Sequence, residues 1–119
     1  MLSGSNRPFS ITISAQSPGS VTFVIKGDLD EDTVPETQRF IDTHIDSTTR
    51  EVVFDLAEVS FMVSRGIHLM VNLTQLLSAR SGKIKLLNPQ PNIRRIFRLT
   101  RLDRAIDILP EDDAGAATS

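Results

Sequence analysis

The sequence predicts an α/β protein with one domain and one hydrophobic core. Strand-like and helix-like apolar patterns alternate in the order β-β-α-β-α-β-α, without an internal repeat or a domain boundary. A length of 119 residues fits one such domain. Strands that alternate with helices imply parallel pairing through right-handed crossovers, and the two leading strands add a hairpin. We therefore expect a mixed sheet.

The chain opens with the predicted hairpin. Residues 9–14 alternate apolar and hydroxyl side chains, as expected of a half-buried strand. Residues 16–20 contain a Pro-Gly pair and predict the turn. Apolar side chains alternate again over residues 21–25, in a second strand that stops at Gly27.

A helix is predicted to begin at Thr33, after an acidic loop at Asp28–Asp32. Thr33 and Glu36 form a capping-box pattern, and Pro35 suits the first turn. Residues at helical spacing then form one stripe: Val34, Thr37, Phe40, Ile41, His44 and Ile45.

The second predicted helix has a predicted strand before it and another after it in the sequence. Residues 51–56 are nearly all apolar, which suggests a strand buried on both faces. The second helix covers about residues 66–79, and Ser81-Gly82 ends it. A fourth strand follows at residues 83–87.

The third helix follows a break at residues 88–91, where two prolines occur. Its apolar side chains are Ile93, Ile96, Phe97, Leu99 and Leu102, and Ala105, Ile106 and Ile108 close the pattern. Residues 1–8 and 110–119 are rich in small or polar side chains and are predicted to be flexible, which leaves a domain at residues 9–109.

The composition narrows the class of protein. A formal net charge of −2 argues against a dedicated nucleic-acid binder, and the absence of cysteine removes disulfides, thiol catalysis and thiolate metal sites. No apolar segment is long enough for membrane insertion, and the first residues lack a hydrophobic signal region. We therefore expect a cytoplasmic protein.

The residue pattern predicts neither an active site nor a metal site. The loop Asp28–Asp32 places acids at alternate positions like a calcium loop, but Thr33 stands where the required glycine would be and Arg39 at the twelfth position. His44 and His68 lack the spacing of a metal pair. No nucleophile–base pair can be assembled, so no enzyme activity and no cofactor are predicted.

Five arginines are predicted to form a basic cluster on the third helix: Arg94, Arg95, Arg98, Arg101 and Arg104. Arg94, Arg98 and Arg101 are predicted to share one face. A solvated helix face, an acidic protein partner and a nucleic acid are the three interpretations, in decreasing order of preference, because no aromatic side chain interleaves except Phe97.

Ser64 lies where a buried strand passes into the start of a helix. Such a position exposes free backbone N–H groups and the positive end of the helix dipole. A serine there can cap the helix, and it can also carry a phosphate at low electrostatic cost. The residues alone leave both roles open.

Five segments, taken together, resemble the STAS domain family in its branch of bacterial anti-sigma factor antagonists. The resemblance covers about residues 9–109. The segments are Gly27-Asp28-Leu29-Asp30, Val52–Leu56 with Val59-Ser60-Phe61-Met62, Val63-Ser64-Arg65-Gly66-Ile67, Gly82–Leu87, and Pro91–Phe97 with Leu99–Leu102. The third lies where the family has Asp-Ser-Ser-Gly-Leu or Asp-Ser-Thr-Gly-Leu. The resemblance implies a mixed sheet with helices mainly on one face.

The resemblance also implies a function. In that family the first serine of the signature is phosphorylated by a partner that is both anti-sigma factor and serine kinase, and the unphosphorylated form binds that partner and frees the sigma factor. Ser64 matches this serine and is the candidate phosphoacceptor. The implied partner-binding residues are Asp28, Asp30, Val63, Ser64, Arg65, Gly66 and Ile67. A homodimer is left open.

Two departures from the signature favour an alternative. Val63 replaces the acid beside the phosphoacceptor, and Arg65 replaces the second hydroxyl residue. Arg65 could pair with a phosphate or with an acidic partner. The alternative function is that of a constitutive, non-phosphorylated adaptor in another assembly, such as a transporter ATPase or a signalling complex.

Overall fold

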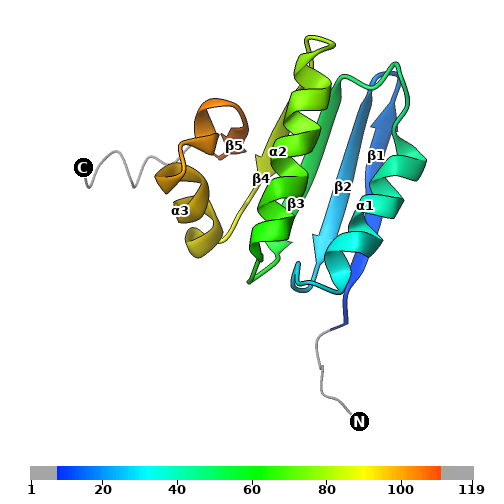
Figure 1. Ribbon diagram of the computed structural model, residues 1–119. Helices are drawn as coiled ribbons and strands as arrows, with labels where there is room; N and C mark the ends of the chain where they lie inside the picture. Colours follow the sequence, from blue (N-terminus) through cyan, green and yellow to red (C-terminus); the bar gives the residue numbers. More distant parts are fainter. Residues whose placement is uncertain (1–7, 111–119) are drawn as a thin grey trace.

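The computed structural model describes residues 8–110, which form one α/β domain around a five-stranded sheet (Figure 1). The strand order is β1-β2-β3-β4-β5. The strands are β1 (Ser10–Ser17), β2 (Ser20–Lys26), β3 (Glu51–Glu58), β4 (Lys83–Leu87) and β5 (Asp107–Leu109). β1 is antiparallel to β2 and every other pair is parallel, which confirms the mixed sheet. Except for Pro8 and Pro110, the two predicted flexible segments lie outside the described residues.

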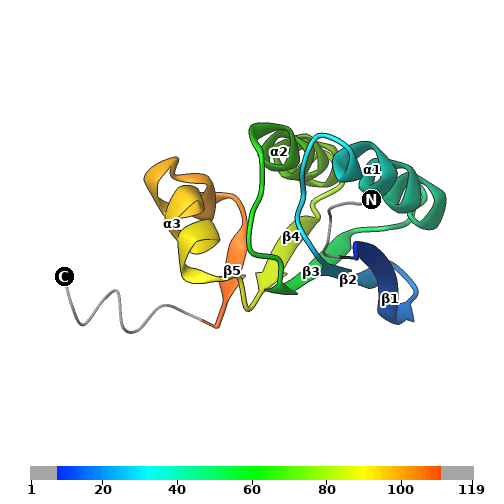
Figure 2. The same ribbon diagram turned by 90° about the horizontal axis from the view of Figure 1, so that it is seen from below.

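The helices lie on one side of the sheet, as predicted (Figure 2). α1 (Thr33–His44) lies over β1 and β2, and α2 (Ser64–Ser78) lies over β3 and β4. α3 (Pro91–Leu99) and a short 3₁₀ helix, η1 (Leu102–Arg104), lie toward β5. The core lies between the sheet and these helices. Its largest fully buried side chains are Phe23, Phe54, Phe97, Ile25, Leu29, Ile41, Leu56, Met70, Leu77, Ile84, Leu86 and Ile93.

The opposite face of the sheet has no helix over it in the described part of the chain, so β3 is not buried on both faces as predicted (Figure 2). On that face only Val53 is buried, between Thr22 and Lys85 of the neighbouring strands. Lys85 also pairs with Glu51 at 2.7 Å, and this ion pair lowers the pKa of the Glu51 carboxyl and raises that of Lys85. The apolar run in β3 therefore combines core residues on the face that the helices cover with one valine, Val53, that is buried on the other face.

The predicted capping box at α1 is wrong. The residue before the helix is Asp32, and its side chain makes no cap bond. The Thr33 hydroxyl lies inside the first turn, where it donates to the Asp28 carbonyl at 2.7 Å and accepts from the Asp30 N–H at 2.8 Å. Asp30 takes over the capping: its carboxylate accepts from the backbone N–H groups of Asp32 and Thr33, both at 2.9 Å. The Thr33 hydroxyl therefore organises the loop.

Three details at the C-terminal side differ from the sequence prediction. β5 was not predicted, because three residues are too few to show alternation. α3 ends at Leu99, so Arg101 and Arg104 lie beyond the helix, and Arg101 does not share a helix face with Arg94 and Arg98 as predicted. Arg101 has a left-handed conformation with φ of 63°. After α2, the left-handed position that usually favours glycine is taken by Ser81 (φ 61°) and not by the glycine that follows it. Gly82 instead passes so close to the Arg50 carbonyl that a Cβ would collide with it.

Candidate functional site

The acidic loop and the Ser64 segment lie side by side at the C-terminal ends of β2 and β3. β2 and β3 are parallel neighbours, so the segments that follow them leave at the same edge (Figure 1). Leu29 and Met62 form an isolated parallel bridge there. The Leu29 N–H donates to the Phe61 carbonyl, and the Val63 N–H donates to the Leu29 carbonyl, both at 2.9 Å. These bonds bring together residues that are more than thirty positions apart.

Ser64 is the first residue of α2, two residues earlier than the predicted start. The residue before the helix is Val63, in extended backbone conformation, so Ser64 does not cap the helix. The Ser64 side chain is exposed, and its hydroxyl has no hydrogen-bond partner within residues 8–110. The first turn of α2 contains no acidic residue. An anion on Ser64 would therefore lie at the positive end of the helix dipole without a local acid in that turn.

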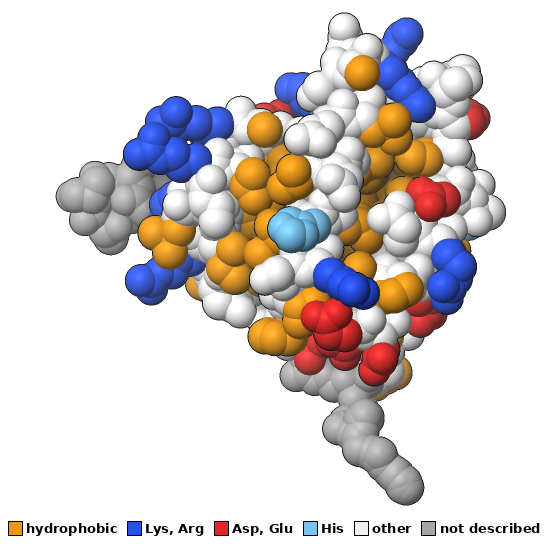
Figure 3. Space-filling model, in the orientation of Figure 1, with side chains coloured by type: hydrophobic (Ala, Val, Ile, Leu, Met, Phe, Trp, Pro, Cys, Tyr) orange, Lys and Arg blue, Asp and Glu red, His pale blue; other side chains and the backbone are white. Residues whose placement is uncertain are grey.

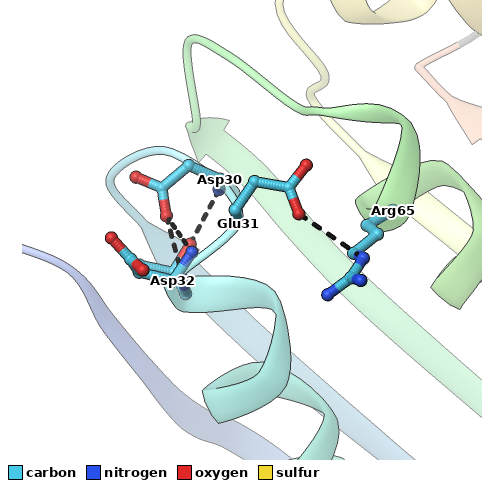
Figure 4. Close-up of polar contacts among 5 residues, drawn as sticks. Asp30, Glu31, Asp32 and Arg65 are labelled. Atoms are coloured by element: carbon cyan, nitrogen blue, oxygen red, sulfur yellow. Dashed lines mark hydrogen bonds and ion pairs between the residues drawn. The ribbon is translucent and has the colours of Figure 1, made fainter.

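Asp28 and Asp30 both support the loop. The Ser60 hydroxyl donates to the Asp28 carboxylate at 2.8 Å, and the Asn92 side chain donates to the Ser60 carbonyl at 2.9 Å. The pKa of the Asp30 carboxyl lies below its usual range, chiefly because the Thr33 backbone N–H donates to it. Asp30 is therefore an ionised group that holds the shape of the loop (Figure 4).

Arg65 points toward the loop and pairs with Glu31, with 3.4 Å between Arg65 Nε and Glu31 Oε1 (Figure 4). Both side chains are about two-thirds exposed, at 65% and 67%. An exposed pair of this kind contributes about 1 kcal/mol or less to stability. The pair therefore links the loop to α2 loosely, and both groups stay accessible to a partner.

Gly66, Val63 and Ile67 contribute to the site through packing. Gly66 is buried, and a Cβ on it would lie 2.7 Å from Cγ of Met62. A glycine lets α2 approach the Leu29–Met62 bridge closely. Val63 and Ile67 are half-buried and pack against the core. Of the seven predicted residues, the exposed ones are Ser64 and Arg65, while Asp28 and Asp30 are half-buried.

The structure adds two residues to the site that the sequence analysis did not select. Glu31 enters through its ion pair with Arg65. Phe61 is 51% exposed, although it directly precedes the buried Met62. An aromatic side chain exposed beside charged groups is typical of the centre of a protein interface. The sequence held no signal for its exposure, because alternation would place Phe61 on the same side as Val59, which is buried.

Within residues 8–110, no group of three or more His, Cys, Asp or Glu side chains is placed to hold a metal ion. Across the same residues, no helix combines the length and the apolar character needed to cross a membrane. His68 is exposed on α2, and His44 lies at the end of α1 with its ring over Phe40.

Comparison with known proteins identifies the family. Residues 12–114 match the family model of the STAS domain. The chain is 33% identical over 84 residues to an anti-sigma F factor antagonist of Lysinibacillus sphaericus, which covers 68% of this chain and 72% of the relative.

Solved structures share the fold. The anti-sigma factor antagonist SpoIIAA in its unphosphorylated form superposes with a TM-score of 0.73 at 24% identity, over 92% of this chain and 96% of that one. Bacillus SpoIIAA in its phosphorylated form gives a TM-score of 0.69 at 24% identity, over 92% of this chain and all of that one (100%). The chain belongs to the STAS domain family, in the branch of anti-sigma factor antagonists.

Proposed function

We propose that this protein binds an anti-sigma factor of the serine-kinase type and thereby frees a sigma factor. The observation that carries this proposal is the Leu29–Met62 bridge, which holds the acidic loop beside the exposed Ser64. The sequence similarity to a protein named an anti-sigma F factor antagonist supports this proposal. Since sigma factors act on cytoplasmic transcription, the protein works in the cytoplasm.

The binding face combines charge with one apolar contact. Asp28, Asp30, Glu31 and Arg65 supply groups of both signs, and Phe61 supplies exposed aromatic area beside them. Aromatic side chains contribute most when a partner covers them completely, whereas charges at the rim set orientation and association rate. Phe61 therefore provides much of the affinity, and the charged loop selects the partner.

Phosphorylation of Ser64 by the partner's kinase activity dissociates the complex. A phosphate adds about −1.5 to −2 charges and three strong acceptor oxygens. Because the Ser64 hydroxyl is exposed and serves no hydrogen bond within residues 8–110, adding the phosphate breaks no contact of the described fold. The helix dipole stabilises the anion. The phosphate acts by repelling acidic groups of the partner and by its bulk.

The protein is then a substrate and a binding partner, and it performs no catalysis of its own. The site described above contains an alcohol at Ser64 but places no general base within hydrogen-bond reach of it in the described residues. Transfer of the phosphoryl group depends on the kinase that docks on this face.

The test is the affinity of charge variants for the purified kinase-type anti-sigma factor from the same cells. Ser64→Asp and Ser64→Glu are expected to weaken the complex at least tenfold, which is about 1.4 kcal/mol. Ser64→Ala is expected to bind like the unaltered protein. Ser47→Asp adds the same charge to an exposed loop at the other end of the domain and is the matched control. Equal weakening by Ser47→Asp and Ser64→Asp would reject the assignment of this face.

A second candidate function is that of a constitutive adaptor that is never phosphorylated. The Arg65–Glu31 pair and Val63 favour it, because the signature acid is missing and a cation lies beside the acceptor serine. In that case Arg65 receives an acid of another protein assembly. Phosphoserine at Ser64 in protein isolated from its native cells would exclude this candidate.

A further inference from the structure

A second charged surface lies on α3 and η1, toward the β5 edge of the sheet. Between residues 91 and 104 the chain has five arginines and one acidic residue, Asp103. Figure 3 shows blue side chains gathered along the left edge of the molecule, where Figure 1 places α3 and the turn after it. We name this surface, formed by Arg94, Arg95, Arg98, Leu99, Arg101 and Arg104, the arginine surface.

Most cations of the arginine surface have no acidic partner. Arg94, Arg95, Arg101 and Arg104 make no ion pair and no side-chain hydrogen bond within residues 8–110. The lysines differ, because all three lie on strands and pair with acids: Lys26 with Glu58, Lys83 with Asp107 and Lys85 with Glu51. The fold thus neutralises its lysines and leaves a group of guanidinium charges unneutralised.

The surface also contains an apolar side chain and a strained residue. Leu99 is 70% exposed, more than any other large hydrophobic residue that the structure describes, and it follows the exposed Arg95 and Arg98 on α3. Arg101 occupies a left-handed conformation with φ of 63°, which costs an L-residue about 1–2 kcal/mol. The chain thus has a positively charged side chain at Arg101, where glycine would adopt the same backbone conformation without strain.

We propose that the arginine surface binds an acidic segment of a protein partner whose apolar side chain covers Leu99. Guanidinium groups bind carboxylates through paired N–H donors, and protein interfaces are enriched in arginine and depleted in lysine. The surface has five arginines and no lysine around an exposed leucine. This inference goes beyond the proposed function, because it concerns a different surface from the one around Ser64.

Protein is favoured over nucleic acid and over a membrane by the rest of the surface. Phe97, the aromatic residue of α3, is fully buried and cannot stack on bases. The net charge of −2 and the acidic loop Asp28–Asp32 oppose the approach of a long polyanion or an anionic bilayer. A short acidic segment meets only the local positive charge.

The test measures fluorescence anisotropy of labelled probes with the full chain. The first probe is an amphipathic peptide of glutamate, leucine and alanine, and the second is the same peptide with glutamine in place of glutamate. The third and fourth probes are single-stranded DNA and phosphatidylserine vesicles. The altered protein carries R95E, R101E and R104E together. Its control carries K26E, R39E and R50E, which change the net charge equally on exposed side chains elsewhere.

The acidic peptide is expected to bind, and the glutamine peptide to bind at least about tenfold more weakly. R95E/R101E/R104E is expected to lose at least about tenfold in affinity, L99S severalfold, and the control variant less than about twofold. Equal losses in the two triple variants, or no binding of the acidic peptide, would overturn the proposal. Tighter binding of DNA or vesicles that the arginine variant abolishes would also overturn it. Binding that appears only after removal of residues 111–119 would overturn it in favour of the chain's own acidic C-terminal segment.

Discussion

Replacing Arg101 by glycine is predicted to stabilise the protein. Arg101 has φ of 63° and ψ of 19°, and its N–H donates to the Arg98 carbonyl at 3.1 Å. The left-handed conformation costs an L-residue about 1–2 kcal/mol, and glycine would relieve this strain. Glycine also loses more backbone entropy on folding, which costs about 0.5–1 kcal/mol and offsets part of the gain. Because the Arg101 side chain is exposed and has no partner within residues 8–110, its removal breaks no described contact. The net expectation is a gain of about 0.5–1 kcal/mol.

The assay is urea unfolding followed by far-ultraviolet circular dichroism, with a thermal scan alongside. For a domain of this size the gain corresponds to a rise of about 2–5 °C in Tm. Arg101→Ala is the matched control, since it removes the same charge and keeps the backbone strain. The alanine variant is expected to stay within about 0.5 kcal/mol of the unaltered protein. A glycine variant no more stable than the alanine variant would refute the assignment of strain to this turn.

Three further predictions concern single side chains. Gly82→Ala is expected to lower the free energy of unfolding by about 2 kcal/mol or more, because the new Cβ meets the Arg50 backbone; urea midpoints test this, and an unchanged midpoint contradicts it. Ser64→Ala is expected to change the same quantity by less than about 0.5 kcal/mol, since Ser64 caps nothing; a loss of about 1 kcal/mol would restore the capping role. Asp30 has a lowered pKa in the folded protein, so its contribution is complete well above its unfolded pKa of about 3.9 and is lost as the pH falls through the folded pKa. In Asp30→Asn the free energy of unfolding is therefore expected to fall less steeply as the pH is lowered. Part of the acid dependence persists, because the pKa values of Asp46 and Glu51 are also lowered in the folded protein. An unchanged slope of the free energy of unfolding against pH contradicts this.

The sequence predicted the elements that carry a clear period. Alternation in β1 and β2 and the helical stripe of α1 each place one face in the core, and the structure confirms those faces. In α2 the helical spacing of Met70, Leu73 and Leu77 is confirmed by their burial, whereas Leu76 is exposed. β5 could not be predicted, because three residues next to Pro110 carry no measurable period. The burial of β3 was overestimated for a related reason: a run of apolar residues does not show whether helices cover one face or two.

The prediction of the site depended on contacts between segments distant in the sequence. Ser64 and the acidic loop were each recognisable locally, but their proximity follows from the parallel pairing of β2 with β3. The Arg65–Glu31 pair also could not be read from spacing, since its members are far apart in the chain. The capping role was misassigned at Thr33, because a hydroxyl residue near a helix start can lie inside the first turn. For Ser64 the sequence left capping open, and the structure places this serine inside the first turn of α2 as well.

We propose that phosphate on Ser64 controls binding to a kinase-type anti-sigma factor. The most direct measurement titrates that partner with the full chain before and after phosphorylation by the partner itself, with the modified residue located by peptide mass spectrometry. One phosphate is expected, on Ser64, and the modified form is expected to bind at least tenfold more weakly, equivalent to about 1.4 kcal/mol. A phosphate at another residue, or equal affinity of the two forms, would contradict it.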